Sequence, residues 1–335
     1  MSPISLVGAA SYMPRRIVDN RFFQIEENEE VHVMFRGVKL RHHVSKDETA
    51  AFMIDQAARK LADRLNLNLQ KDVDVLLTNV TLPDQPFTGC GAIVCHGLGI
   101  RPKWVLDAHN GGCVSFLYMI GWAKAIMATY GAKTALVANV QNAGGRLFSQ
   151  EQNRYRKQAR IPGDGCGVGY LVANDESPVR SIDFRTYGEY AADMNAIRDD
   201  GVPWYEPSTH SGYVDFTEAK IADIMARANR MVPEVIKSTC KQAELPLDAI
   251  DVFITNQPNR IFLRNWREAV QVRPEQHVQT FERHGNLFGA GLPICLEEAV
   301  ETGRLQPGHH LVFGGFSHAG DYAAAAVVHW KPGGN

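Results

Sequence analysis

The sequence has no excess of charge of one sign. Its 35 Lys and Arg residues nearly balance 37 Asp and Glu residues, and the net charge is −2. Proteins that bind nucleic acid or an anionic membrane surface usually gather basic side chains into patches or runs. We therefore expect neither nucleic acid nor a membrane as a partner.

A secretion signal and a long apolar run are also missing. Residues 1–8 contain no basic segment followed by an apolar core, and no stretch approaches the roughly 20 apolar residues that span a bilayer. These absences predict a cytoplasmic protein. The six cysteines should stay reduced there, and we interpret Cys90 and Cys95 as core thiols because they have no partner pair at zinc-site spacing.

The length and the hydrophobic pattern predict an α/β fold in two parts. At 335 residues the chain exceeds the roughly 250–300 residues that one hydrophobic core supports. Apolar, β-branched runs alternate with helical patterns, which is typical of buried sheets covered by helices. Strands are expected at residues 4–10, 73–78, 134–139, 166–173, 179–184, 252–256, 310–313 and 323–329. Helices are expected at residues 48–67, 113–130, 215–244, 262–271 and 292–303.

The two halves of the chain have similar patterns. Each has an early strand, a long helix, a strand with polar residues at its end, and a Gly-rich turn before its last strand. This similarity predicts an internal duplication, with its boundary in the turn-rich segment 174–178 and units of 1–174 and 175–335. Residues 185–217 are rich in aromatic, Gly and Pro residues without a period, and we expect them to cover or shape a substrate pocket.

Cys113 is the first candidate for chemistry. It follows Gly111 and Gly112 and stands directly at the start of a helical pattern. A thiol at a helix N-terminus meets unpaired backbone N–H groups and the positive end of the helix dipole, both of which favour the thiolate. The position indicates covalent acyl transfer, and the alternative is a buried structural cysteine.

Four further segments place polar residues beside apolar strands. Residues 255–260 follow a predicted strand, at the strand end where α/β folds place their sites. Residues 314–320 form a Gly-rich turn that can present backbone N–H groups to an anionic oxygen. The other two are the turns at 161–167 and 283–289. Each segment alone is a weak signal, because Asn, Gly and Pro cluster in ordinary turns.

In their order and spacing, Cys113 and these segments resemble the β-ketoacyl-ACP synthase III branch of the thiolase superfamily over essentially the full chain. That family carries a cysteine at a helix start, a Gly-Asp-Gly turn, a His-Gln-Ala-Asn motif, a Gly-Asn pair and a C-terminal Gly-rich loop, all with counterparts here. Residues 7–14 and 35–43 resemble its first strand and its early basic segment. The resemblance implies a five-layered α-β-α-β-α fold of two similar halves, and a homodimer.

The resemblance also implies an acyl group carried as a thioester on Cys113. The acyl group would come from acyl-CoA or acyl-ACP as substrate, without a cofactor. One departure stands out, because Asn256 occupies the place of the family's catalytic histidine, and the expected set becomes Cys113, Asn256 and Asn286. Both amides can donate to a thioester carbonyl, but an amide cannot accept and return a proton near neutral pH.

Two histidines are candidates for the missing base. His318 lies in the C-terminal Gly-rich loop, which reaches the reactive centre in the wider superfamily, and we expect it to face Cys113. His284 is the second candidate, and the alternative for either is an ordinary loop residue. The resemblance places the oxyanion hole at the backbone N–H groups of Cys113 and Phe316.

Substrate-binding residues are assigned by the same resemblance. Phe87 matches a region that crosses the dimer interface to line the partner's acyl pocket, with ordinary interface packing as the alternative. We interpret Asp164, between two glycines, as part of a structural turn beneath the site. Cations for the phosphates of coenzyme A or phosphopantetheine are expected from Arg36, Arg154, Arg156, Lys157 and Arg260.

The residues and the resemblance together predict a ketosynthase III-like acyltransferase or condensing enzyme, which passes an acyl group from Cys113 to a carbon or heteroatom acceptor. Its pathway would produce specialised metabolites, polyketides or fatty acids, and the missing histidine favours a specialised pathway. Two alternatives stay open. One is a thioester hydrolase, in which water is the acceptor, and the other is a degenerate subunit that supports an active partner. The retained cysteine argues against the second.

Overall fold

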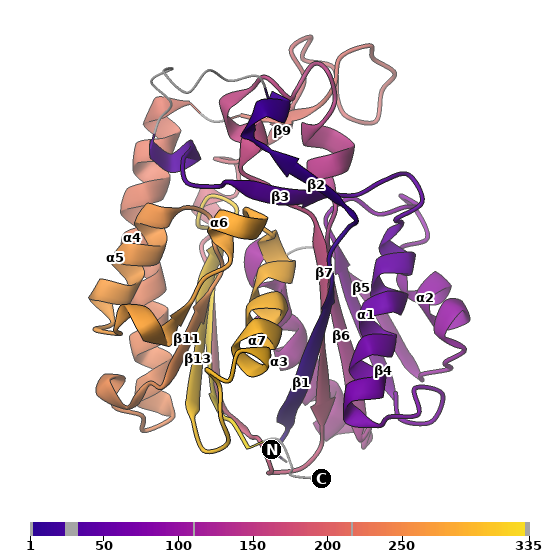
Figure 1. Cartoon of the computed structure of the whole chain (residues 1–335), viewed down its shortest axis with the longest axis vertical. Helices are drawn as coiled ribbons and strands as arrows, with labels where there is room; N and C mark the ends of the chain where they lie inside the picture. The colour runs from indigo at the N-terminus through magenta and orange to yellow at the C-terminus, as the bar shows by residue number, and fades with distance from the viewer. Residues whose placement is uncertain (1–2, 24–32, 110, 216, 332–335) are drawn as a thin grey trace.

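Two five-stranded sheets form the centre of the molecule (Figure 1). The computed structural model describes residues 3–23, 33–109, 111–215 and 217–331. The first sheet has the strand order β1 (Ser5–Tyr12), β7 (Gly165–Val172), β6 (Thr134–Gln141), β4 (Val75–Val80) and β5 (Trp104–Ala108). The second has the order β8 (Val179–Thr186), β14 (Tyr322–His329), β13 (His310–Ser317), β11 (Val252–Thr255) and β12 (His277–Val278).

The two sheets have the same topology. In each, three antiparallel strands, β1-β7-β6 or β8-β14-β13, are followed by two parallel strands, β4-β5 or β11-β12. The first sheet is built from residues 5–172 and the second from residues 179–329. Each strand of one sheet therefore has a topological equivalent in the other.

Helices fill the three layers around these sheets. Helices α3 (Ser115–Tyr130) and α7 (Gly291–Glu301) lie between the sheets, and Figure 1 shows the outer helices on either side. On the first sheet these are α1 (Ala50–Leu65) and α2 (Gly91–Leu98), and on the second α4 (Glu218–Gln242) and α5 (Arg260–Ala269). The five-layered α-β-α-β-α fold expected from the sequence is confirmed.

Side-chain caps mark where three of the outer helices begin. Thr49 accepts from the Phe52 N–H at the start of α1, Thr217 from the Lys220 N–H at α4, and Asn259 from the Phe262 N–H at α5. Such caps satisfy N–H groups that have no partner inside the helix. Every strand and helix expected from the sequence is present with its ends displaced by a few residues. Residue 216, within the expected helix 215–244, lies outside the described residues.

The sequence pattern missed several shorter elements. Helix α2 has no local cap, because the Cys90 and Gly91 N–H groups donate to Asp107 on strand β5, at 3.1 and 2.9 Å. Strand β5 lies at the sheet edge and exposes its middle residues. The other elements without a strong local signal are β2 (Arg16–Asp19), β3 (Leu40–His43), β9 (Ala196–Ile197), β10 (Tyr213–Val214) and α6 (Phe281–His284).

Helix α3 corrects one sequence expectation. With the turn before it, residues Gly112–Tyr130 are long and apolar enough to cross a membrane by length and composition. The helix packs its Phe116, Leu117 and Ile120 side chains into the core between the two sheets. Burial from both sides accounts for its apolar sequence, because each face of the helix contacts one sheet.

Candidate active site

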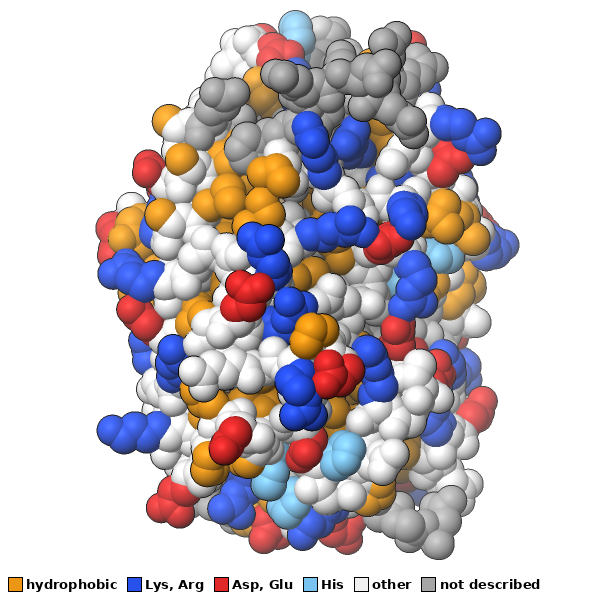
Figure 2. Space-filling view, turned by 60° about the vertical axis from the view of Figure 1, so that its left-hand side comes forward, with side chains coloured by type: hydrophobic (Ala, Val, Ile, Leu, Met, Phe, Trp, Pro, Cys, Tyr) orange, Lys and Arg blue, Asp and Glu red, His pale blue; other side chains and the backbone are white. Residues whose placement is uncertain are grey.

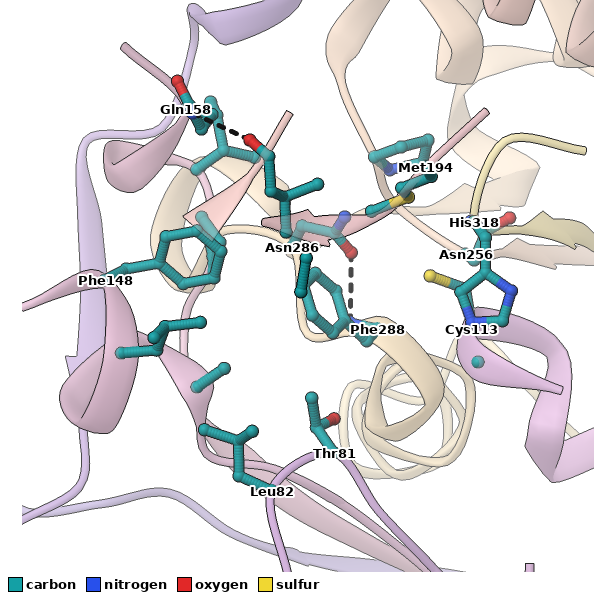
Figure 3. A pocket seen from close by; sticks show the side chains of 18 of the residues that line it. Thr81, Leu82, Cys113, Phe148, Gln158, Met194, Asn256, Asn286, Phe288 and His318 are labelled. Atoms are coloured by element: carbon teal, nitrogen blue, oxygen red, sulfur yellow. Dashed lines mark hydrogen bonds between the residues drawn. The ribbon is translucent and has the colours of Figure 1, made fainter. Parts of the chain in front are cut away.

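Cys113 lies in a tight turn between β5 and α3. The turn is a 3-10 helix, Gly112–Val114, and the two glycines before the cysteine have φ angles of 91° at Gly111 and 43° at Gly112. Both angles lie in the left-handed region, which glycine adopts without steric cost. The half-buried Cys113 side chain faces a cavity of about 340 Å³ (Figure 3).

The cavity is lined mainly by apolar side chains. Figure 3 shows Cys113, Asn256 and His318 at one end, with Leu82 and Phe148 toward the other. The irregular segment 185–217 contributes three lining residues, as expected from the sequence: Met194, Ala196 and Val214.

Polar side chains attach this segment to the rest of the cavity wall. Gln158 Nε2 donates to the Val214 carbonyl at 3.0 Å, and Asn153 Nδ2 donates to the Gly212 carbonyl at 2.9 Å. The wall of the cavity is therefore joined by hydrogen bonds between two segments that are distant in the sequence.

His318 lies in the turn between β13 and β14, which the Gly320 N–H closes by donating to the Ser317 carbonyl at 2.8 Å. Its φ angle is 47°, in the left-handed region, although it is not a glycine. The Nδ1 atom lies 2.9 and 3.1 Å from the two carboxylate oxygens of Asp321. A Cβ atom built on Gly112 would lie 2.8 Å from His318 Nε2, so this nitrogen lies beside the nucleophile turn.

Asp321 was not singled out by the sequence analysis. Its side chain is buried and only three residues beyond His318. The one local signal for Asp321 in the sequence is a carboxylate three residues after a histidine in the same turn. The structure thus groups a thiol, an imidazole and a carboxylate around the turn.

Ser317 fixes the nucleophile turn to the end of β13. Its hydroxyl donates to the Gly111 carbonyl and accepts from the Val114 N–H at 3.2 Å. Because these contacts surround Cys113, they hold the cysteine turn and the histidine turn at a constant separation. Sequence reasoning gave no indication of this role for Ser317.

The Asn256 side chain follows strand β11 and forms reciprocal hydrogen bonds with the backbone of Phe316. Its Nδ2 donates to the Phe316 carbonyl at 3.1 Å, and its Oδ1 accepts from the Phe316 N–H at 3.2 Å. It also forms a hydrogen bond with the Cys113 thiol. The Phe316 N–H, which we expected in the oxyanion hole, thus donates to Asn256 in this arrangement.

The Asn286 side chain has one hydrogen-bond donor, Nδ2, that faces the cavity. It lies before α7, and its Oδ1 accepts from the Phe288 N–H at 3.0 Å. Its backbone joins the opposite turn, since the Asn286 N–H donates to the Ile161 carbonyl at 2.9 Å and its carbonyl accepts from Gly163 at 3.1 Å. No acceptor for Nδ2 occurs among the described residues, and Figure 3 shows the Asn286 amide within the cavity.

The protonation of Cys113 differs from the sequence expectation. Burial raises the pKa of its thiol to about 12, although the hydrogen bond with Asn256 lowers it in part, and the charge of Asp321 raises it further. Burial opposes the charged thiolate, and here it outweighs the helix N-terminus, which favours the thiolate. The resting site therefore holds a thiol, and a base is needed to generate the nucleophile.

His284, the second candidate base, does not line the cavity. Its ring lies 5.5 Å from that of His42, and burial lowers its pKa to about 4. The neighbouring Asp164 is structural, as expected. It accepts from the N–H groups of Val44, Gly144 and Gly145 at 2.9, 2.7 and 2.6 Å.

The residues expected from the sequence to bind substrate, Phe87 and the five basic residues, do not line the cavity of this chain. Phe87 is 98% exposed. Arg36 follows Met34 and Phe35, both of which line the cavity. Arg154 stacks on the rings of Phe22 and Tyr155. Arg156 forms an ion pair with Asp199 and stacks on the Tyr213 ring. Lys157 is exposed, and Arg260 forms an ion pair with Glu282.

A cluster of arginines surrounds a second hollow on the surface. Arg260, Arg264 and Arg267 lie on one side of α5, and Arg283 of α6 faces them. Figure 2 shows Lys and Arg side chains gathered over the side of the molecule that carries α4 and α5, with carboxylates between them.

Comparison with known proteins agrees with this fold. A family model described as the C-terminal part of 3-oxoacyl-[acyl-carrier-protein] synthase III matches residues 240–330. Among curated relatives, the β-ketoacyl-[acyl-carrier-protein] synthase III of Clostridium perfringens is 23% identical over 334 residues, covering 98% of this chain and 99% of that protein. The protein of the same name from Bradyrhizobium diazoefficiens is 26% identical over 339 residues, covering 97% and 98%.

Solved structures superpose over nearly the whole chain. The 3-oxoacyl-[acyl-carrier-protein] synthase III of Aquifex aeolicus gives a TM-score of 0.84 at 19% identity, covering 98% of this chain and all of that one. A variant of OleA from Xanthomonas campestris gives 0.80 at 17% identity, covering 98% and 96%. The curated relatives are named as synthases, and this type of synthase belongs to the acyltransferase class expected from the sequence. The chain therefore has the thiolase-like fold of these synthases.

Proposed function

We propose that the protein is an acyltransferase that carries an acyl group as a thioester on Cys113. The observation that carries this proposal is the position of Cys113 and His318 at one end of an apolar cavity. An apolar cavity favours a hydrocarbon chain, because burial removes that chain from water. The thiol at the end of the cavity would hold the carboxyl carbon of the chain.

His318 is the base in this proposal. The Asp321 carboxylate accepts from Nδ1–H, which leaves a lone pair on Nε2 beside the nucleophile turn. Nε2 takes the proton of the Cys113 thiol, and the thiolate attacks the carbonyl carbon of the donor thioester. The donor's carbon–sulfur bond then breaks, and its thiol leaves with the proton from His318. Asn256, where the relatives are expected to carry histidine, donates a hydrogen bond to the Cys113 sulfur.

Two donors remain for the oxyanion that forms during this attack. One is Asn286 Nδ2, and the other is the backbone N–H of Cys113 itself. Fixed donors in a site shielded from water stabilise developing negative charge more than water does. With these two donors, the oxyanion needs no hydrogen bond from the Phe316 N–H.

The acyl donor is acyl-CoA or acyl-ACP in this proposal. The arginines on α5 and Arg283 supply positive charge for phosphates or for an acidic carrier protein. Arg260 pairs closely with Glu282, and Arg283 pairs with Glu298 at 2.6 Å. Arg264 and Arg267 lie farther from their carboxylate, at 4.0 and 3.9 Å from Glu268, so they are the stronger candidates. We place the protein in the reducing cytoplasm, which fits its six unpaired cysteines. Its pathway would be one of specialised-metabolite, polyketide or fatty-acid biosynthesis.

Incubation with a series of acyl-CoA thioesters tests the proposal. Intact-mass spectrometry is expected to show the protein mass increased by one acyl group. The adduct should disappear in Cys113→Ala and persist in Cys95→Ala, which removes a half-buried thiol outside the cavity. Circular dichroism would confirm that both variants are folded. Absence of an adduct with every acyl-CoA and acyl-ACP donor would contradict the proposal.

We further propose a homodimer that forms through the edge of the first sheet. Strand β5 exposes 39% of Val105 and 42% of Leu106, and Phe87 is more exposed still. An exposed apolar edge strand pairs readily with a second chain. In a dimer, Phe87 would reach the acyl pocket of the partner.

Replacing Leu106 with lysine should therefore convert the dimer to a monomer in sedimentation analysis. A buried, unpaired ammonium group would oppose association across the edge strand. The matched control is Ile17→Lys, which adds the same charge at a residue on β2 that is 60% exposed. A wild-type monomer, or equal dissociation of both variants, would contradict this interface.

A further inference from the structure

We infer that the acyl acceptor is an alcohol or an amine, so that the protein forms esters or amides. The inference rests on the proposed acyl-thioester at Cys113 and names the chemistry of its second substrate. Three observations carry it: the tautomer of His318, the occupied donors around Asn256 and Phe316, and the charge of Asp321.

The first observation is that Asp321 fixes the tautomer of His318. A carboxylate accepts hydrogen bonds and donates none, so the proton of the neutral imidazole must be on Nδ1. Nε2 then carries a lone pair. An imidazole in this state removes a proton from an O–H or N–H group, but it cannot donate a hydrogen bond to a carbonyl oxygen.

The second observation concerns the hydrogen-bond donors. Carbon–carbon bond formation from a malonyl thioester passes through an enolate, whose oxygen needs N–H donors. The Asn256 Nδ2 group already donates to the Phe316 carbonyl and contacts the Cys113 thiol, and the Phe316 N–H donates to Asn256 Oδ1. Asn286 Nδ2 is then the one side-chain amide donor at the site without an acceptor among the described residues. In the proposed function it serves the thioester carbonyl on Cys113 together with the Cys113 N–H, so an enolate from a second thioester would have no side-chain amide donor of its own.

The third observation is the charge balance. Asp321 is 7% exposed and its charge acts on Cys113, while no Lys or Arg occurs among the described residues that line the cavity. Loss of carbon dioxide moves the negative charge of the malonyl carboxylate onto the enolate oxygen without transferring a proton to His318, so this charge and that of Asp321 would share the site with no cation between them. Attack by an alcohol or amine transfers a proton to His318, and the imidazolium then lies between the oxyanion and Asp321.

The transfer step balances as follows. The acceptor oxygen or nitrogen forms a bond with the thioester carbonyl carbon, while its proton moves to His318 Nε2. The tetrahedral intermediate collapses, the bond between that carbon and Cys113 Sγ breaks, and the sulfur takes the proton back from His318. The products are an ester or amide and the original thiol. Asp321 touches no reacting atom, and it acts as a positioning residue through His318.

The acceptor test uses the acylated enzyme. The full-length enzyme is first acylated with acyl-CoA and separated from excess donor. It is then mixed with ethanolamine, glycerol or malonyl-CoA as the acceptor probe. We expect ethanolamine or glycerol to shorten the lifetime of the acyl-enzyme and to yield the acylated probe, with no carbon dioxide from malonyl-CoA. Release of carbon dioxide with a β-ketoacyl product, or loss of the acyl group to water alone, overturns the inference while the proposed function stands. An acyl-enzyme whose lifetime no alcohol or amine probe shortens also overturns it. Failure to form the acyl-enzyme contradicts the proposed function itself.

The positioning role of Asp321 is tested with Asp321→Asn. The asparagine amide can donate to Nδ1 and move the imidazole proton to Nε2, so transfer to the reactive probe should fall tenfold or more. The KM for the probe should stay unchanged while kcat falls, because Asp321 touches no reacting atom. Asp321→Glu should restore part of the rate. A rate that falls equally in Asp321→Asn and Asp321→Glu would assign Asp321 a structural role only.

A second histidine–carboxylate pair provides the matched control. His310 Nδ1 lies 3.6 Å from Asp251, and neither residue lines the cavity. His310→Ala therefore removes an imidazole with an acidic partner without changing the site. Its kcat and KM for the probe should equal those of the wild type.

Discussion

Replacing His318 with alanine is expected to slow both loading of Cys113 and transfer from it by about 10²–10⁴-fold, the usual contribution of a positioned general base. His318 Nε2 lies beside Gly112, and the described cavity lining includes one other histidine, His109, before the nucleophile turn. Because no carboxylate among the described residues contacts His109, we expect it to replace little of this function. The rate of acyl-enzyme formation, followed by rapid quenching and mass spectrometry, measures the effect.

The pH profile of this variant is more diagnostic than its rate at one pH. Without the base, loading depends on the small fraction of Cys113 present as thiolate. With a thiol pKa of about 12, that fraction grows about tenfold for each pH unit, and the loading rate should rise in parallel. The wild-type rate should instead level off once His318 is neutral. Parallel pH profiles in the two proteins, or an equal loss in His310→Ala, would show that His318 is not the base.

Replacing Gly112 with alanine is expected to lower acyl transfer by about 10²-fold, the usual effect of moving a catalytic group by about 1 Å. The new Cβ atom would lie 2.8 Å from His318 Nε2 and 3.0 Å from Ser317 Oγ, so both side chains would have to shift away from the cysteine turn. The φ angle of 43° adds about 1–2 kcal/mol of backbone strain for any residue with a Cβ atom. Transfer rates and urea unfolding of the variant separate the two effects.

Gly131 offers a matched control for that strain. It ends helix α3 with a φ angle of 71°, and a Cβ atom there would meet nothing within 4 Å. Gly131→Ala should therefore lose a similar free energy of unfolding and retain its transfer rate. If both variants lose activity equally, the close approach of His318 to the cysteine turn has no catalytic importance.

Much of the fold was predictable because its central strands and helix α3 are buried on both sides, while the long outer helices α1 and α4 have one apolar face. Strands such as β4 and β6, and helix α3, give continuous apolar patterns that need no tertiary information. Helix α2 and strand β5 could not be predicted from local sequence, because each depends on contacts with the other. The cap of α2 comes from Asp107 on β5, and β5 exposes the side chains that would have marked it as a strand.

The site was predictable in part. Cys113 and His318 could be singled out from their positions in glycine-rich turns, whereas Asp321 and Ser317 act through contacts that only the folded chain reveals. The hydrogen bond of the Phe316 N–H could not be predicted, because its acceptor, Asn256 Oδ1, comes from a distant part of the sequence. The protonation of Cys113 was misjudged because the helix argument is local, whereas burial depends on the whole fold.

The equal topology of the two sheets has a consequence for how activity depends on the integrity of the fold. Cys113 precedes α3, which belongs to the first half of the chain, and His318 lies between two strands of the second sheet. Ser317 joins the two turns through hydrogen bonds with Gly111 and Val114. A small opening between the halves would therefore separate thiol from base while each sheet stayed intact. Loss of acyl transfer would report that opening before any change in secondary structure.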